Sequence, residues 1–94
     1  MLLRIVRMDF KPEKTGEFIT FFNTIKGKIA NFPGCNHVEL CKDAGFDHVL
    51  YTFSEWDDEA ALEAYRKSAL FEDAWTKTKA MFGGKPQAYS LIQD

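Results

Sequence analysis

The sequence predicts a single α+β domain over residues 1–94, with two helical regions covering one face of a four-stranded antiparallel sheet. Two observations lead to this prediction. Segments with strand and helix character follow one another in the order strand, helix, strand, strand, helix, strand. No linker, internal repeat or low-complexity segment divides the chain, whose length fits one hydrophobic core.

The first strand and the first helix are separated by a proline. Residues 2–10 are rich in β-forming residues and are too few for a helix before Pro12. Pro12 suits the first turn of a helix, and Glu13 faces the positive end of its dipole. The predicted helix has one apolar face and ends at Pro33-Gly34. That face comprises Phe18, Phe22, Ile25, Ile29 and Phe32.

The middle of the chain predicts a hairpin followed by a helix. Residues 35–42 and 47–55 have strand character and flank a short connection, Asp43–Phe46. Asp57 and Asp58 are candidate caps for the helix that begins at Glu59.

The last third of the chain predicts a second helical stretch and a final strand. Ser68 marks a possible break before an apolar face that includes Phe71, Trp75 and Phe82. Gly83-Gly84 ends the helix, and residues 87–93 form the last strand. The resulting βαββαβ order is that of a ferredoxin-like fold.

The first strand carries apolar residues on both of its sides. Leu3 and Ile5 lie on one side, whereas Val6, Met8 and Phe10 lie on the other. The helices can cover only one face of the sheet, and no segment remains for the second. An uncovered apolar sheet is an association surface, and a two-fold dimer is the commonest closed solution. The sequence therefore predicts a homodimer paired through sheet faces.

Composition excludes several classes of partner. The net charge of −2 argues against nucleic acid, which requires a basic surface. No apolar run approaches the roughly 18 residues of a membrane span. Arg4 and Arg7 interrupt the first apolar stretch, whereas a signal peptide places its positive charge before an unbroken apolar segment.

The two cysteines are predicted to be free. Cys35 and Cys41 are about 20 Å apart on one strand, too far for a disulfide. We therefore expect free thiols and a cytoplasmic protein.

Four short motifs resemble the antibiotic biosynthesis monooxygenase family of dimeric α+β barrels, and they span nearly the whole chain. They are Phe10-Lys-Pro-Glu, Pro33-Gly-Cys, Ser54-Glu-Trp-Asp-Asp-Glu-Ala-Ala-Leu-Glu-Ala-Tyr and Ser68-Ala-Leu-Phe. The resemblance implies ferredoxin-like protomers paired sheet to sheet, each with a pocket between sheet and helices. It also implies cofactor-independent oxidation of quinol-like or polyketide aromatics, or, in one branch, haem degradation.

The sequence departs from the family pattern at three positions. Tyr65 stands where the family often has His, and Trp75 stands where the haem-degrading branch has its axial His. Val6 falls where that branch has Asn on the first strand. These departures disfavour haem binding or degradation.

The hairpin supplies the candidate bases. If its strands pair around Ala44-Gly45, Cys41 lies opposite His48, and His37 and Glu39 share a face with both. A carboxylate beside His37 could raise the pKa of its imidazole and make it a base. The alternative is a solvated or interfacial pair. Cys41 and His48 lack third and fourth metal ligands, so we expect no metal site.

An aromatic set lies nearest the expected pocket and comprises Trp56, Tyr65, Phe71 and Trp75. These residues could simply belong to the core. They could instead stack against a flat aromatic substrate, with the Tyr65 hydroxyl as a hydrogen-bonding group.

The sequence therefore predicts a cofactor-independent monooxygenase that acts on a small aromatic or quinol-like compound. Its deprotonated substrate would itself reduce oxygen, helped by an apolar pocket, a base and a hydrogen-bond donor. The predicted catalytic residues are His37 or His48 as base and Tyr65 as donor; Trp56, Phe71 and Trp75 bind the substrate. Two alternatives stay open: a non-catalytic dimeric module that binds a small ligand, and the disfavoured haem protein.

Overall fold

A computed structural model describes all residues from 1 to 94. One antiparallel sheet has the order β2-β3-β1-β4. Its strands are β1 (Leu2–Asp9), β2 (Cys35–Lys42), β3 (Val49–Trp56) and β4 (Gln87–Ile92). The helices are α1 (Thr15–Ala30), α2 (Glu59–Arg66) and α3 (Ala69–Lys79), with a short 3-10 helix, η1 (Pro12–Lys14). This arrangement confirms the predicted α+β, ferredoxin-like fold.

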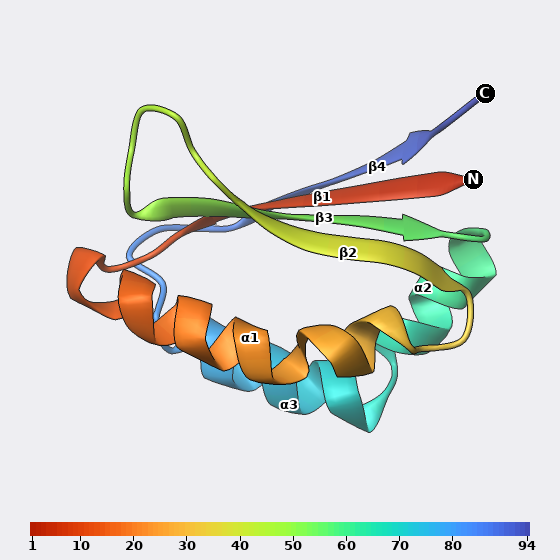
Figure 1. Cartoon of the computed structure of the whole chain (residues 1–94), viewed down its shortest axis with the longest axis horizontal. Coiled ribbons are helices and arrows are strands. Elements are labelled where there is room, and N and C mark those ends of the chain that lie inside the picture. The colour runs from red at the N-terminus through yellow and green to blue at the C-terminus, as the bar shows by residue number, and fades with distance from the viewer.

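The helices all lie on one side of the sheet, and the other side is bare (Figure 1). No helix is both long enough and apolar enough to cross a membrane. The main core fills the space between α1 and the sheet. Phe18 and Phe22 from α1 are almost completely buried there, and the Phe18 ring stacks on Phe10 at 4.4 Å between centroids. A smaller cluster of Leu2, Trp56 and Leu62 lies beneath α2.

Two side-chain caps set the boundaries of α2 and α3. The Asp58 carboxylate accepts a hydrogen bond from Ala61 N at 2.8 Å, which satisfies a free amide of the first turn. The Ser68 hydroxyl accepts from Phe71 N at 3.1 Å and donates to the Tyr65 carbonyl at 2.6 Å. Ser68 therefore ends one helix and begins the next, as the sequence predicts, and fixes Tyr65 close to Phe71.

Gly34 links α1 to β2 in a conformation that other residues rarely adopt. Its φ is 86°, and a Cβ atom there would collide with the Cβ of Ala61 on α2. The absence of a side chain lets the turn pack directly against α2.

The predicted hairpin register is wrong by three residues. Cys41 lies opposite Tyr51, and not opposite His48. The connection is longer than expected because the Asp43 carboxylate organises it: one oxygen accepts from Gly45 N at 2.8 Å, and the other accepts from the Tyr51 hydroxyl at 2.9 Å. These bonds hold the pKa of the Asp43 carboxyl below its ordinary value.

An odd shift in register exchanges the residues that share a sheet face. Val38 and Leu40 therefore face the helices together with Thr52 and Ser54. The face away from the helices carries His37, Glu39 and Cys41 beside Tyr51, Phe53 and Glu55. The two cysteines are free and lie near opposite ends of β2.

Candidate functional site

A cavity of about 290 Å³ lies between the sheet and the helices. Its volume is close to the lower end of the range for small-molecule sites, about 300 Å³. All four strands contribute to its floor, with Val6, Met8 and Ala88 among the side chains that face it. Helices α1, α2 and α3 form its walls. The cavity can therefore hold a ligand of one or two rings.

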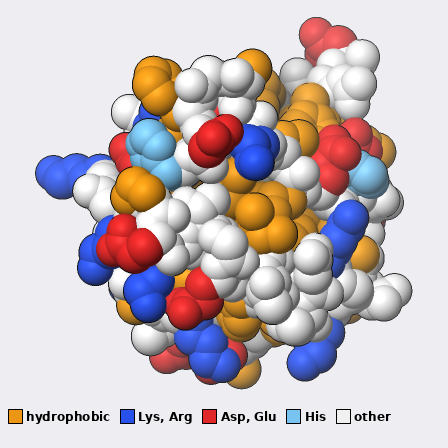
Figure 2. Space-filling model, turned by 60° about the vertical axis from the view of Figure 1, so that its left-hand side comes forward, with side chains coloured by type: hydrophobic (Ala, Val, Ile, Leu, Met, Phe, Trp, Pro, Cys, Tyr) orange, Lys and Arg blue, Asp and Glu red, His pale blue; other side chains and the backbone are white.

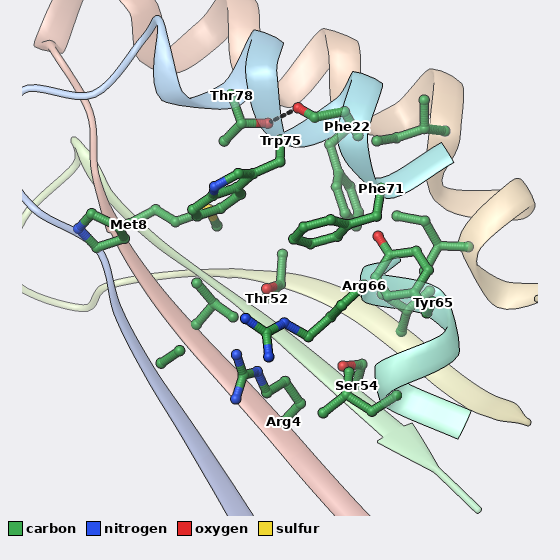
Figure 3. A pocket seen from close by; sticks show the side chains of 18 of the residues that line it. Arg4, Met8, Phe22, Thr52, Ser54, Tyr65, Arg66, Phe71, Trp75 and Thr78 are labelled. Carbon is green, nitrogen blue, oxygen red and sulfur yellow. Dashed lines mark hydrogen bonds between the residues drawn. The ribbon is translucent and has the colours of Figure 1, made fainter. Parts of the chain in front are cut away.

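A continuous aromatic wall runs along the cavity (Figure 3). The rings of Phe71 and Trp75 are nearly parallel, with 5.8 Å between centroids and 13° between planes. Tyr65 meets Phe71 edge to face at 5.2 Å. Tyr65 also stacks on Trp56 at 5.0 Å. Since Phe71 and Trp75 retain partial exposure, their ring faces are available to a flat ligand. Trp56 is 1% exposed and packs against the Tyr65 ring on the side away from the ligand space.

Tyr65 is a neutral hydrogen-bond donor over the physiological pH range. Burial raises the pKa of its hydroxyl to about 12, and the neighbouring Cys35 adds to this rise. None of the side-chain hydrogen bonds of the structure involves the Tyr65 hydroxyl, and no fully buried side-chain polar atom lacks a partner, so the hydroxyl is not fully buried. It is therefore open to a ligand as a donor, but it cannot serve as a base near neutral pH.

Two guanidinium groups meet at the polar end of the cavity (Figure 3). Arg4 comes from β1 and donates to the Ser90 hydroxyl at 2.9 Å. Arg66 comes from the last turn of α2 and lies 3.5 Å from the Glu63 carboxylate. Burial, followed by the positive charge of Arg66, lowers the pKa of Arg4, whereas Glu63 raises it. The two like charges are therefore close enough to repel each other.

The other polar groups of the cavity are mostly occupied by the protein itself. The Ser54 hydroxyl accepts from Trp56 Nε1 at 2.9 Å, and Thr78 donates to the Ala74 carbonyl at 2.7 Å. No Asp, Glu, His or Cys lines the cavity. The lining is thus aromatic and aliphatic, with positive charge at one end.

Four of the predicted site residues come together, and two lie elsewhere. Trp56, Tyr65, Phe71 and Trp75 all line the cavity, whereas the two histidines do not. His37 lies on the bare face, with its Nε2 3.6 Å from Glu39 Oε1. The other histidine, in the loop before β3, has its Nε2 3.6 Å from Asp9 Oδ1. Both histidine side chains reach the surface, on opposite sides of the view in Figure 2.

Sequence reasoning missed Arg4 and Arg66. Arg4 alternates with Val6 and Met8 on one side of β1, so a charged residue on the inward side of a strand was visible in the sequence. Arg66 directly follows Tyr65 but looks like an ordinary positive charge at a helix end. Only the fold shows that α2 brings it to β1.

The cavity does not supply the histidine ligation expected of a haem-degrading protein. Its lining holds neither His nor Cys. A neutral His and a deprotonated Cys are common axial ligands of haem iron. Elsewhere in the chain, no three His, Cys, Asp or Glu side chains converge as metal ligands would.

Known structures share this fold over the whole chain. A structure described as an antibiotic biosynthesis monooxygenase has a TM-score of 0.91 and 20% identity, covering 100% of this chain and 99% of its own. A conserved protein from Methanosarcina mazei Go1 has a TM-score of 0.91 and 19% identity, covering 100% of this chain and 94% of its own. At these identities the similarity establishes the fold alone.

A curated relative from Halobacterium salinarum is 25% identical over 79 residues. It is named "Putative heme-binding protein VNG_2021C". The match covers 84% of this chain but 16% of that much longer protein.

The family assignment rests on the first 77 residues of the chain. The family model for antibiotic biosynthesis monooxygenase matches residues 1–77, which include β1 through most of α3 and nearly all of the cavity lining. The chain belongs to the antibiotic biosynthesis monooxygenase family.

Proposed function

We propose that this protein binds a small, flat, quinol-like aromatic compound in the cavity and oxidises it with O₂, without a bound cofactor. The observation that carries this proposal is the open aromatic wall of Tyr65, Phe71 and Trp75 above an apolar floor. Such a wall favours stacking of a planar ring, and the Tyr65 hydroxyl supplies a directional donor. Family membership supports the oxygenase chemistry.

The reaction balances with O₂ as the sole oxidant. A ring CH₂ in the keto form of a phenolic substrate becomes a carbonyl and loses four electrons. One oxygen atom of O₂ enters this carbonyl, and the other leaves as water with the two hydrogens. The protein contributes by holding the substrate, excluding bulk water and stabilising its electron-rich anion. Because no base lines the cavity, the substrate gives up its proton to bulk water before it enters and binds as the anion.

The absence of a lining base also favours the second candidate, a module that binds an aromatic ligand without turning it over. Oxygen uptake separates the two. With 1,4-naphthalenediol, the oxygenase should consume O₂ faster than the heat-denatured protein, and Trp75→Ala should abolish the difference. Binding of the diol without extra O₂ consumption would support the non-catalytic module. Failure of the diol to bind would overturn both.

We also propose that the protein forms a homodimer through the bare face of the sheet. Leu3 and Ile5 of β1, Phe53 of β3, and Tyr89 and Leu91 of β4 all point to this face. Tyr89 and Leu91 are 50% and 49% exposed, which is high for large side chains within a sheet. We expect an interface well above about 1,000 Å². Sedimentation should report a dimer at micromolar concentration, and a folded monomer would contradict this part of the proposal.

A further inference from the structure

Positive charge at one end of the cavity is only partly matched by a carboxylate. Arg4 and Arg66 both contribute guanidinium groups to the lining, which holds no acidic residue. Glu63, outside the lining, lies 3.5 Å from Arg66 and offsets one of the two charges. Arg4 has the neutral Ser90 hydroxyl as its hydrogen-bond acceptor. The cluster therefore carries a net positive charge beside an apolar space.

We propose that Arg4 and Arg66 form an oxyanion site, and that the ligand of this cavity is a planar aromatic compound bound through an anionic oxygen group, phenolate or carboxylate. The inference rests on the proposed function and adds the charge and orientation of the ligand. Its oxyanion lies between the two guanidinium groups, and its rings extend toward Phe71 and Trp75.

Three physical arguments support an anion at this position. A guanidinium has five N–H donors, and Arg4 uses one of them on Ser90, so several remain for a ligand. Planar guanidinium groups match the geometry of carboxylate and related oxyanions. Finally, an anion between the arginines would relieve the repulsion between them, which together with the larger effect of burial lowers the pKa of Arg4.

Arg4 is the more important of the two residues. Its side chain comes from the inner strand β1, points to the cavity and forms no salt bridge, although the charge of Glu63 acts on it from a longer distance. Arg66 is more exposed, and its charge is partly neutralised by the Glu63 carboxylate. Removal of the Arg4 charge should therefore weaken anion binding more than removal of the Arg66 charge.

Calorimetric titration with a matched pair of probes tests the proposal. 2-Naphthoate and 2-naphthamide have nearly the same shape, but only the first is anionic. The unmodified protein should bind the naphthoate at least about tenfold more tightly, the factor expected from one charge-assisted hydrogen bond. Arg4→Met should remove most of this preference, and Arg66→Met should remove less. Lys67→Met is the control, since it deletes an exposed charge next to Arg66 outside the cavity.

A spectroscopic titration distinguishes the two kinds of oxyanion. Only the ionised form of 4-nitrophenol absorbs in the visible, so its absorbance reports the pKa of the bound phenol. A phenolate site should lower this pKa in the unmodified protein and in Lys67→Met, but not in Arg4→Met. A preference for naphthoate without a change in this pKa would identify a carboxylate as the anion.

The outcomes separate this inference from the proposed function. Equal affinity for naphthoate and naphthamide, with an unchanged nitrophenol pKa, would overturn the oxyanion site and leave the aromatic cavity intact. No binding of any of the three probes would overturn the proposed function, and the oxyanion site with it.

Discussion

The two faces of β1 differ in chemistry although they belong to the same eight residues. The side toward the helices presents Arg4, Val6 and Met8 to a cavity that is enclosed by aromatic rings. The side away from the helices presents Leu3 and Ile5 to open solvent in the single chain. One face encloses a small space, whereas the other offers a broad surface.

This difference indicates what each face can bind. A concave cavity lined by rings and guanidinium groups suits one small molecule. A broad sheet with apolar residues on adjacent strands suits another protein surface. In the proposed function, the ligand therefore binds on the helix side of the sheet and the second protomer on the bare side.

The largest expected effect distinguishes core from cavity among the aromatic residues. Trp56 is 1% exposed and hydrogen-bonded to Ser54, so Trp56→Ala should lower the free energy of unfolding by about 3–5 kcal/mol. Trp75 borders open space, so Trp75→Ala should lower it by less and should abolish ligand binding. Urea denaturation and calorimetric titration measure the two quantities. Equal losses of stability would show that Trp75 is also a core residue.

A charge on the bare face should disrupt the dimer and spare the cavity. Phe53→Asp should weaken dimerisation by at least about a hundredfold, because burial of an unpaired carboxylate costs several kcal/mol. Asn23→Asp adds the same charge on the exposed side of α1 and should leave the dimer intact. Analytical ultracentrifugation over a concentration series measures both. An unchanged dimer in Phe53→Asp would place the interface elsewhere.

Alkaline pH should reveal the burial of Tyr65. Because its pKa is raised from 10.0 to about 12, the folded state holds this proton more tightly than the unfolded state. The resulting stability is present below about pH 10 and is lost as the pH rises toward 12, by roughly 2 kcal/mol. Tyr65→Phe should flatten this part of the stability curve. Parallel curves for the two proteins would contradict a buried, neutral hydroxyl.

The smallest effect concerns the same hydroxyl as a ligand contact. Tyr65→Phe preserves the stacking on Trp56 and removes a donor that bonds to no protein group. Thermal stability near neutral pH should therefore be unchanged, and affinity for a phenolic ligand should fall about fivefold, the value of one ordinary hydrogen bond. Lower stability with unchanged affinity would make Tyr65 structural.

Local signals explain how much of the fold could be predicted. Pro12, Gly34 and Ser68 mark helix ends through conformational preferences and hydrogen bonds that involve near neighbours. The register of β2 on β3 was mispredicted because it depends on the Asp43 side chain, which folds the connection into a longer loop. A pairing assumed from the turn sequence could not include that contact.

Long-range contacts explain what was missed at the site. The aromatic set was predictable because Tyr65, Phe71 and Trp75 lie close together in the sequence. Arg4 and Arg66 are far apart in the sequence and meet only when α2 packs over the sheet. The predicted bases, His37 and His48, lie outside the cavity, and no sequence spacing revealed which face of the sheet the helices cover.

Methyl NMR on adjacent residues of β1 tests the division between the two faces most directly. The side chains of Val6 and Met8 face the cavity, whereas those of Leu3 and Ile5 face the other way. Ring currents of a bound naphthalene act over short distances, so titration with 2-naphthoate should shift the Val6 and Met8 methyl signals and leave those of Leu3 and Ile5 in place. Shifts confined to Leu3 and Ile5 would place the ligand on the bare face and contradict the account.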